Sequence, residues 1–212
     1  MLETFINYGS LAGGALAALT GGICIATNSR NSTHKRIYFM VLLFFMTDVA
    51  GYVMNLYDIN NVPFYNVMML VQSGFILKLT RDQISVPGHR TIFNYAAVIT
   101  LIFYSCNLCF MQGIYQLNNY SFLTFSLAIA VTSYLLLLEL FSNPEIPPFK
   151  NPWGWFAIAN MIQYAGSIPV WTIYILIPSE VTLIYKMFSI VTALFIVWYF
   201  LLTTGLIWTQ KK

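Results

Sequence analysis

The chain has 212 residues, of which 58% are hydrophobic and 17% aromatic, and only 8% carry a charge. A soluble globular domain has about 25% charged residues, so this composition excludes that class and indicates transmembrane helices. The net charge of +3 does not indicate nucleic-acid binding, because the basic residues follow the pattern of a membrane topology.

Seven hydrophobic runs of spanning length follow one another along the chain. Each has about the 17–25 residues that a helix needs to cross a bilayer core. They lie near residues 5–27, 37–57, 63–80, 91–113, 122–142, 152–177 and 182–207. We therefore predict an all-α polytopic membrane protein, in which residues 1–212 form one seven-helix domain in a cell membrane, such as a bacterial inner membrane.

The basic residues predict how the helices are oriented. Nine of the ten Lys and Arg residues lie at the C-terminus or in and beside the connections after the first, third and fifth runs. The connections on the other side carry only Asp58 and Glu180 as charged residues. Because cytoplasmic loops are enriched in Lys and Arg, we expect the N-terminus outside and the C-terminus inside.

The first run stacks small residues four positions apart, namely Gly9, Gly13, Ala17 and Gly21. Such a face lets a second helix approach closely. It predicts packing either within the bundle or against a partner membrane or signalling protein.

The second run contains one carboxylate, Asp48. A charged Asp at a helix centre costs about 2.5–3.5 kcal/mol on insertion scales. The ten Ile, Leu, Val and Phe residues of 37–56 offset this cost, at roughly −0.3 to −0.6 kcal/mol each. We expect Asp48 to face the bundle, paired or protonated, and to share a helix face with Tyr52 and Asn55 at i+4 and i+7.

Further polar residues follow on the third to fifth runs. The third run has Asn66, Gln72 and Ser73, and the fifth has Glu139 near its cytoplasmic end. Lys78, near the same level on the third run, is the candidate partner of Glu139; alternatively, each of the two side chains extends alone to the membrane surface.

The sixth run repeats the polar arrangement with Asn160, Gln163, Tyr164 and Ser167. A shift of 115 residues, from 48 to 163, aligns "MTDVAG" with "MIQYAG" and Asp48 with Gln163. This match predicts a parallel 3+1+3 repeat, a transporter arrangement with its site near the midplane, unless it is a coincidence of a small apolar alphabet. The polar residues would form an intrabundle cavity or serve as hydrogen-bonding glue between helices.

The seventh run has one basic residue, Lys186, in its outer half. It has two predicted positions: extending outward to headgroups or Glu180, or turning inward to pair with Asp48 or an anionic ligand.

Catalysis has little support in the sequence. The predicted spans contain no histidine, no H-E-x-x-H motif and no pair of carboxylates at one level. His34 and His89 are expected in solvated cytoplasmic loops. We therefore expect a non-enzymatic protein without a cofactor, a metal site or nucleic-acid binding.

A ligand would be small or lipidic, because the external connections are too short to form a ligand-binding domain. Its expected site combines intramembrane polar residues from four helices. These are Asp48, Tyr52, Gln72, Asn160, Gln163, Tyr164, Ser167 and Lys186.

The stretch "NPWGWFAIANMIQYAG" resembles the sixth helix of small seven-helix bacterial membrane modules associated with sensor histidine kinases. Asn151, Pro152, Trp155, Tyr164 and Gly166 carry the resemblance, which covers about sixteen of the 212 residues. It implies a sensory module whose kinase is a separate partner protein, since these residues contain no kinase domain.

Three functional hypotheses follow. The first is a receptor or sensor with a site around Asp48 that acts through a partner. The second is a small-solute transporter of the 3+1+3 kind, and the third is a structural subunit of a membrane complex. A closed cavity holding a lipid or small molecule would favour sensing, a continuous cavity open to one side would favour transport, and a sealed, fully packed interior would favour the subunit.

Overall fold

The computed structural model describes residues 2–27, 32–142, 147–177 and 181–209, without the side chains of 2–7, 181–182 and 184–185. These residues are almost entirely helical, and none of them forms a strand. The helices are α1 (Leu2–Thr27), α2 (Ser32–Leu56), α3 (Val62–Gln83), α4 (Pro87–Cys106) with a π-helical turn η1 (Asn107–Met111), α5 (Asn119–Ser142), a 3-10 turn η2 (Pro148–Lys150), α6 (Pro152–Leu176) and α7 (Val181–Trp208). Each predicted hydrophobic run coincides with one long helix.

Six of the long helices have the length and apolar character needed to cross a membrane, as in a multi-pass membrane protein. The exception is α6, which is long enough but contains Asn160, Gln163 and Ser167 in the middle of its sequence. All three side chains are buried inside the bundle. The polar residues in the middle of α6 therefore face the bundle and are hardly exposed to lipid.

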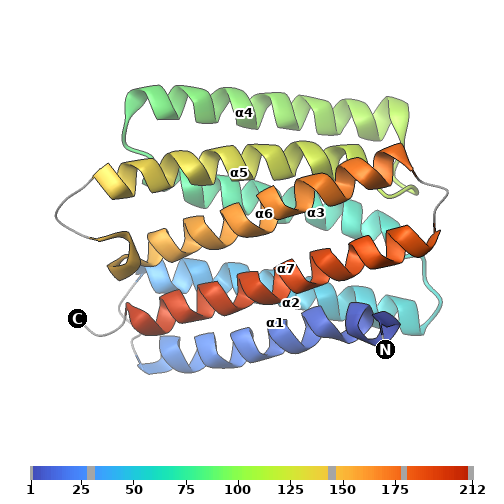
Figure 1. Ribbon diagram of the computed structural model, residues 1–212, viewed down its shortest axis with the longest axis horizontal. Helices are drawn as coiled ribbons and strands as arrows, with labels where there is room; N and C mark the ends of the chain where they lie inside the picture. The colour runs from blue at the N-terminus through green and yellow to red at the C-terminus, as the bar shows by residue number, and fades with distance from the viewer. Residues whose placement is uncertain (1, 28–31, 143–146, 178–180, 210–212) are drawn as a thin grey trace.

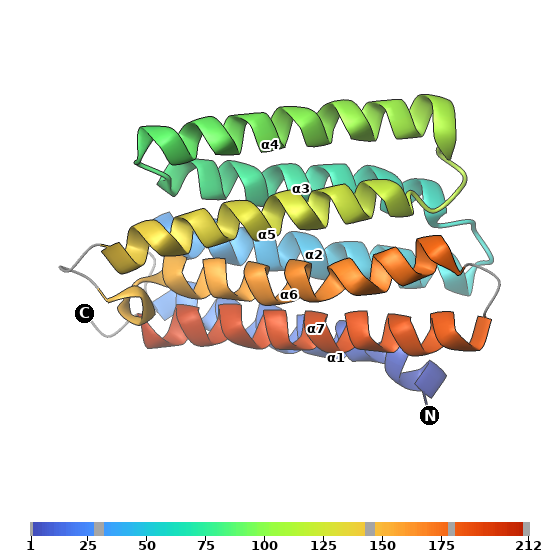
Figure 2. The same cartoon turned by 45° about the horizontal axis from the view of Figure 1, so that its top comes forward.

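The helices run roughly parallel to one long axis and pack in two layers (Figures 1 and 2). In one layer, α7 packs between α1 and α6, and α6 packs against α5. In the other layer, α2 and α3 pack against each other, and α2 also contacts α6 and α7. The remaining helix, α4, lies at the edge of the bundle against α5 and α3. The main neighbours of α2 are α1 and α3, and α2 makes only a limited contact with α6, the other helix with a predicted polar face.

The small residues of α1 pack inside the bundle. A Cβ atom added to Gly21 would lie 2.7 Å from the Tyr38 ring of α2 and 3.5 Å from Leu206 of α7. A Cβ atom at Gly13 would lie 3.5 Å from Ile196 of α7. Of the two uses predicted for this face, the structure therefore shows packing of α1 against α2 and α7.

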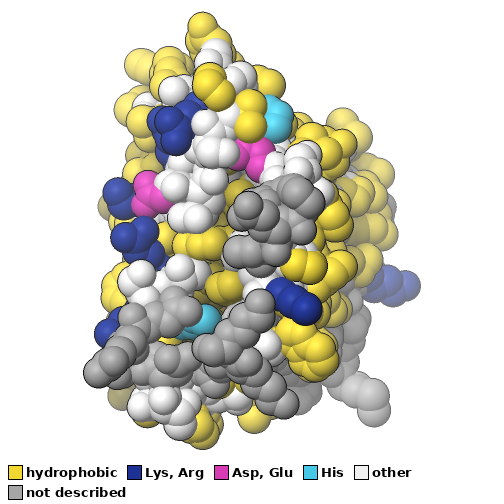
Figure 3. All heavy atoms as spheres, turned by 90° about the vertical axis from the view of Figure 1, so that its left-hand side faces the viewer, with side chains coloured by type: hydrophobic (Ala, Val, Ile, Leu, Met, Phe, Trp, Pro, Cys, Tyr) yellow, Lys and Arg dark blue, Asp and Glu magenta, His cyan; other side chains and the backbone are white. Residues whose placement is uncertain are grey.

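Basic side chains gather at one end of the bundle (Figure 3). The described ones at or near this end come from the starts of α2 and α4, the end of α3 and the turn before α6. They are Lys35, Arg36, Lys78, Arg81, Arg90 and Lys150. Arg30, Lys211 and Lys212 lie outside the described residues. The opposite end holds the α2–α3 connection and the start of α1.

Glu139 differs from its prediction. Its carboxylate accepts hydrogen bonds from the Ser85 backbone N–H and hydroxyl, both at 2.7 Å, and lies 2.9 Å from Nδ1 of His89. The predicted pairing of Glu139 with Lys78 is therefore wrong. The reason is that the start of α4 folds back over α5, where its unpaired backbone N–H groups need an acceptor.

The histidines also differ from their predictions. Both lie in helices, His34 in α2 and His89 in α4. His34 is 1% exposed, and its Nε2 lies 2.9 Å from the Thr209 hydroxyl after α7. The prediction of solvated loops is wrong because the helices extend beyond the apolar runs and pack together at this end.

Candidate ligand-binding site

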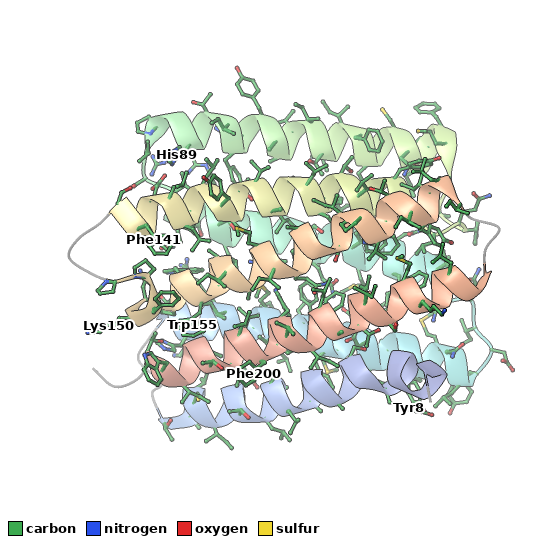
Figure 4. The ribbon with its side chains drawn as sticks, viewed as in Figure 1. Tyr8, His89, Phe141, Lys150, Trp155 and Phe200 are labelled. Carbon is green, nitrogen blue, oxygen red and sulfur yellow. The ribbon has the colours of Figure 1, made fainter. Side chains whose placement is uncertain are left out.

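A polar cavity of about 290 Å³ lies between α1, α2 and α3, at the end of the bundle opposite the basic residues. It is lined by Tyr8, Ser10, Leu11, Asp48, Gly51, Tyr52, Asn55, Leu56, Asn61 and Tyr65. Figure 4 shows Tyr8 near the start of α1, far from Lys150 and His89 at the other end. The cavity, called the outer pocket below, is open on one side. Its volume is near the lower end of the range for small-molecule sites.

The outer pocket confirms the predicted helix face of α2. Asp48, Tyr52 and Asn55 all line it, as their i, i+4, i+7 spacing requires. The Tyr199 hydroxyl of α7 donates to Oδ2 of Asp48 over 3.4 Å, and the Ser10 hydroxyl of α1 is a second donor. Among the described residues, Asp48 forms no ion pair, and its hydrogen-bond partners are neutral hydroxyl groups.

The wall formed by Tyr65 depends on a glycine. A Cβ atom at Gly51 would overlap the hydroxyl oxygen of Tyr65 and lie 2.9 Å from its Cε2 atom. The same glycine carbonyl accepts a hydrogen bond from Nδ2 of Asn61 over 3.3 Å. Gly51 thus allows α3 and the loop before it to close over the face of α2 that carries Asp48.

The turn after α2 brings this wall into place. Asp58 has φ = 54°, the left-handed conformation that commonly ends a helix. The backbone N–H of Ile59 donates to the Met54 carbonyl over 2.9 Å, which completes the helix end. A few residues therefore suffice to return the chain from α2 to Asn61 and Tyr65.

A second cavity of about 50 Å³ lies deeper in the bundle, between α2, α3, α5, α6 and α7. Its polar lining comes from Gln72, Ser73, Ser126, Gln163, Tyr164 and Ser167. The rest of the lining is Phe44, Met69, Phe122, Phe125, Trp171, Val191 and Phe195. The volume suffices for about three water molecules. We call it the inner cavity.

The polar residues of the inner cavity are only partly paired within the protein. Nε2 of Gln72 donates to the Thr47 hydroxyl over 2.9 Å, and the Ser167 hydroxyl donates to the Gln163 carbonyl over 2.6 Å. Oε1 of Gln163, a residue only 2% exposed, has no hydrogen-bond partner among the described residues. Gln163 can therefore bind a polar group in this cavity.

Aromatic side chains lie between the outer pocket and the inner cavity. Tyr199 hydrogen-bonds to Asp48 of the outer pocket and interacts electrostatically with Tyr164, which lines the inner cavity. Phe44 lines the inner cavity one helical turn from Asp48, and its ring centroid is 4.8 Å from that of Trp198. An aromatic layer thus separates the outer pocket from the inner cavity.

The structure divides the predicted site into two groups and omits two residues. Asp48 and Tyr52 line the outer pocket, whereas Gln72, Gln163, Tyr164 and Ser167 line the inner cavity. Asn160 lines neither, because its Oδ1 accepts a buried hydrogen bond from Nε1 of Trp198 over 2.8 Å. Lys186 is exposed on α7 and also lines neither, and Glu180 lies outside the described residues.

Asn66 of α3, also singled out in the sequence, acts as a structural anchor. Its Nδ2 donates to the carbonyls of Ile114 and Gln116, both at 2.8 Å, and its Oδ1 accepts from the Asn118 backbone N–H over 3.1 Å. Asn66 therefore has the predicted structural role, in which its hydrogen bonds hold the connection between η1 and α5 against α3.

Sequence reasoning missed several residues of the outer pocket, including Tyr8, Ser10, Asn61 and Tyr65. It also missed Tyr199, which hydrogen-bonds to Asp48. A tyrosine in a membrane-spanning run carries no signal of its own, since such residues also line lipid and core. Only Gly51, at i+3 from Asp48, indicated that something approaches this part of α2 closely.

Comparison with protein-family models, curated proteins and solved structures finds no match to this chain. The fold and the site define it as an all-helical, multi-pass membrane protein with a polar pocket that opens at one end of the bundle.

Proposed function

We propose that this protein is a seven-span, non-enzymatic membrane receptor, with its N-terminus outside, that binds a small polar solute in the outer pocket and acts through a partner protein. The observation that carries the proposal is the shape of the pocket. It is polar, opens on one side and ends at Asp48 and Tyr199 without continuing into the inner cavity. Transport would require a continuous cavity, so a pocket that opens on one side and stops short of the inner cavity favours binding over passage.

The proposed orientation places the outer pocket on the external side. Basic residues mark the cytoplasmic side of membrane proteins, and all the described ones except Lys186 gather at the end opposite the pocket. Among the described lining residues, Asp48 is the only carboxylate and there is no histidine or cysteine. This lining supports recognition of a solute, and among its described residues there is no histidine to activate the Ser10 hydroxyl as a nucleophile.

Transport of the solute is the second candidate function, and the helix contacts support it. In a 3+1+3 repeat, a two-fold axis exchanges α1–α3 with α5–α7. This axis would turn a contact between α1 and α7 into a contact between α5 and α3, and it would leave a contact between α2 and α6 unchanged. All three of these contacts are present.

Two aligned glycines favour the same repeat. Gly51 of α2 accommodates Tyr65 of α3. Gly166, 115 residues later on α6, lies where a Cβ atom would be 2.9 Å from Leu194 of α7. In each half, a glycine on the second helix admits a side chain of the third helix. The aligned residues Asp48 and Gln163 each line a cavity, as transport between two half-sites would require.

The test is solute binding by the full chain in lipid nanodiscs, measured as a shift of the thermal unfolding midpoint across a panel of small polar solutes. Asn55→Trp would fill the pocket mouth and should remove the shift produced by any bound solute. Ser105→Trp, at an exposed position on α4, is the matched control and should retain it. Absence of binding by any solute to folded protein would refute the receptor and favour the structural subunit.

Uptake into proteoliposomes then separates receptor from transporter. A receptor binds its solute without moving it across the bilayer. Uptake that Asn55→Trp abolishes would replace sensing with transport.

A further inference from the structure

We propose that the outer pocket selects a small organic cation of the ammonium class. This inference rests on the proposed function, since it names the solute that the pocket binds. The first argument is charge: Asp48 is the only charged side chain among the described residues of the lining, and no basic side chain pairs with it. A carboxylate within a low-dielectric bundle attracts a cation and repels an anion strongly.

The carboxylate retains hydrogen-bonding capacity for a ligand. Its two donors in the protein are the hydroxyl groups of Tyr199 and Ser10, and the Tyr199 contact is long at 3.4 Å. Two carboxylate oxygens accept about four hydrogen bonds in total, so about two positions remain. A ligand that brings N–H donors or a diffuse positive charge would complete the shell of Asp48.

The second, independent argument is the aromatic lining. Tyr8, Tyr52 and Tyr65 come from three different helices and all line the pocket that holds Asp48. The rings of Tyr8 and Tyr52 have centroids 5.8 Å apart and are inclined at 60°. Rings inclined in this way form a corner that one cation can contact on two sides, at the distance of about 6 Å where cation–π attraction acts.

Pocket size and lining favour an organic cation over a metal ion. A volume of about 290 Å³ far exceeds that of a dehydrated metal ion. Hard metal ions also require about six or more oxygen ligands around one point. Among the described lining residues Asp48 is the only carboxylate, and no group of three or more His, Cys, Asp or Glu side chains that could hold a metal occurs in the described part of the chain. A small ammonium compound fits both the carboxylate and the rings. Its source is either a free solute or the amine headgroup of a lipid at the outer leaflet.

The experiment uses isosteric probes on the full chain in nanodiscs of phosphatidylglycerol, a lipid without an ammonium group. The probes are choline, ethanolamine, the neutral isostere 3,3-dimethylbutan-1-ol and the anion 3,3-dimethylbutanoate, at constant ionic strength. Binding is measured by calorimetry. We expect at least one of the two cations to bind about tenfold or more tightly than the neutral isostere, and the anion not to bind.

Variants assign the binding to this pocket. Asp48→Asn should remove the preference for the cation, whereas Asp82→Asn, an acid at the opposite end paired with Arg36, should leave it unchanged. Tyr52→Leu should weaken cation binding by about two- to thirtyfold, and Tyr52→Phe, which keeps the ring, should weaken it less. The Tyr52 pair tests the inference even if Asp48→Asn fails to fold.

A failure of the cation site can be distinguished from a failure of the proposed solute binding. Equal binding of the neutral isostere, or cation binding that survives in folded Asp48→Asn, overturns the cation site while solute binding stands. Absence of binding by any probe overturns the inference, and only the wider solute panel then decides the proposed function. In phosphatidylcholine nanodiscs, weaker binding of free choline would identify the lipid headgroup as the occupant, whereas unchanged binding would identify a free solute.

Discussion

Gly51→Ala should perturb the outer pocket through a single methyl group. The added Cβ atom would overlap the hydroxyl oxygen and the Cζ atom of Tyr65 and lie 2.9 Å from its Cε2 atom, so the whole phenol must move. Overpacking of this kind costs about 1–3 kcal/mol, whereas a Gly→Ala change in a helix gains at most about 1 kcal/mol. We expect a net loss of about 0–2 kcal/mol and a much larger loss of solute binding, because Tyr65 forms one wall of the pocket.

The matched control is Gly74→Ala on α3, where a Cβ atom would meet nothing within 4 Å. That variant should be neutral or more stable than the parent by up to about 1 kcal/mol. Free energies of unfolding come from titration of the purified protein with a denaturing detergent. The expected difference between the two glycine variants is about 1–3 kcal/mol.

A double-mutant cycle tests the physical cause. With Tyr65→Ala as background, the Gly51 methyl group meets open space, so Gly51→Ala should then behave like Gly74→Ala. A coupling energy near zero between positions 51 and 65 would refute the reasoning. It would mean that the two helices separate freely at this point or that Gly51 matters for another reason.

Three further outcomes follow from other contacts. Gly154→Ala should be the most damaging glycine change, because its Cβ atom would overlap the Pro148 backbone carbonyl, which cannot rotate away. A thermal unfolding midpoint equal to that of the parent protein would contradict this expectation. Trp198→Phe should lower the free energy of unfolding by about 1–3 kcal/mol, because it leaves the buried Asn160 oxygen without its donor. The same detergent titration measures this loss, and an unchanged free energy would show that Asn160 finds another partner. Glu139→Gln should lower the free energy of unfolding by about 1–3 kcal/mol and speed amide hydrogen exchange at the start of α4, because the carboxylate accepts backbone hydrogen bonds there. Unchanged exchange at the start of α4 would show that this carboxylate does not stabilise the helix end.

The sequence by itself determined the helices and their faces. Seven apolar runs predicted seven helices, since a spanning segment must satisfy its backbone hydrogen bonds internally and helices do so locally. The i, i+4, i+7 spacing placed Asp48, Tyr52 and Asn55 on one face, and the structure places all three in one pocket. Helical periodicity is a local property, so it can be derived from one segment alone.

The tertiary structure decided which faces meet. One predicted site became two cavities separated by Tyr199 and Phe44, because the rotation of α6 turns Gln163 toward α3 and α5 and away from Asp48. Glu139 paired with the start of α4 instead of Lys78, and Asn160 paired with Trp198. Each of these contacts joins residues on different helices. Their pairing depends on the rotation and crossing of whole helices, which are set by close packing at positions such as Gly51, and spacing along one helix does not specify it.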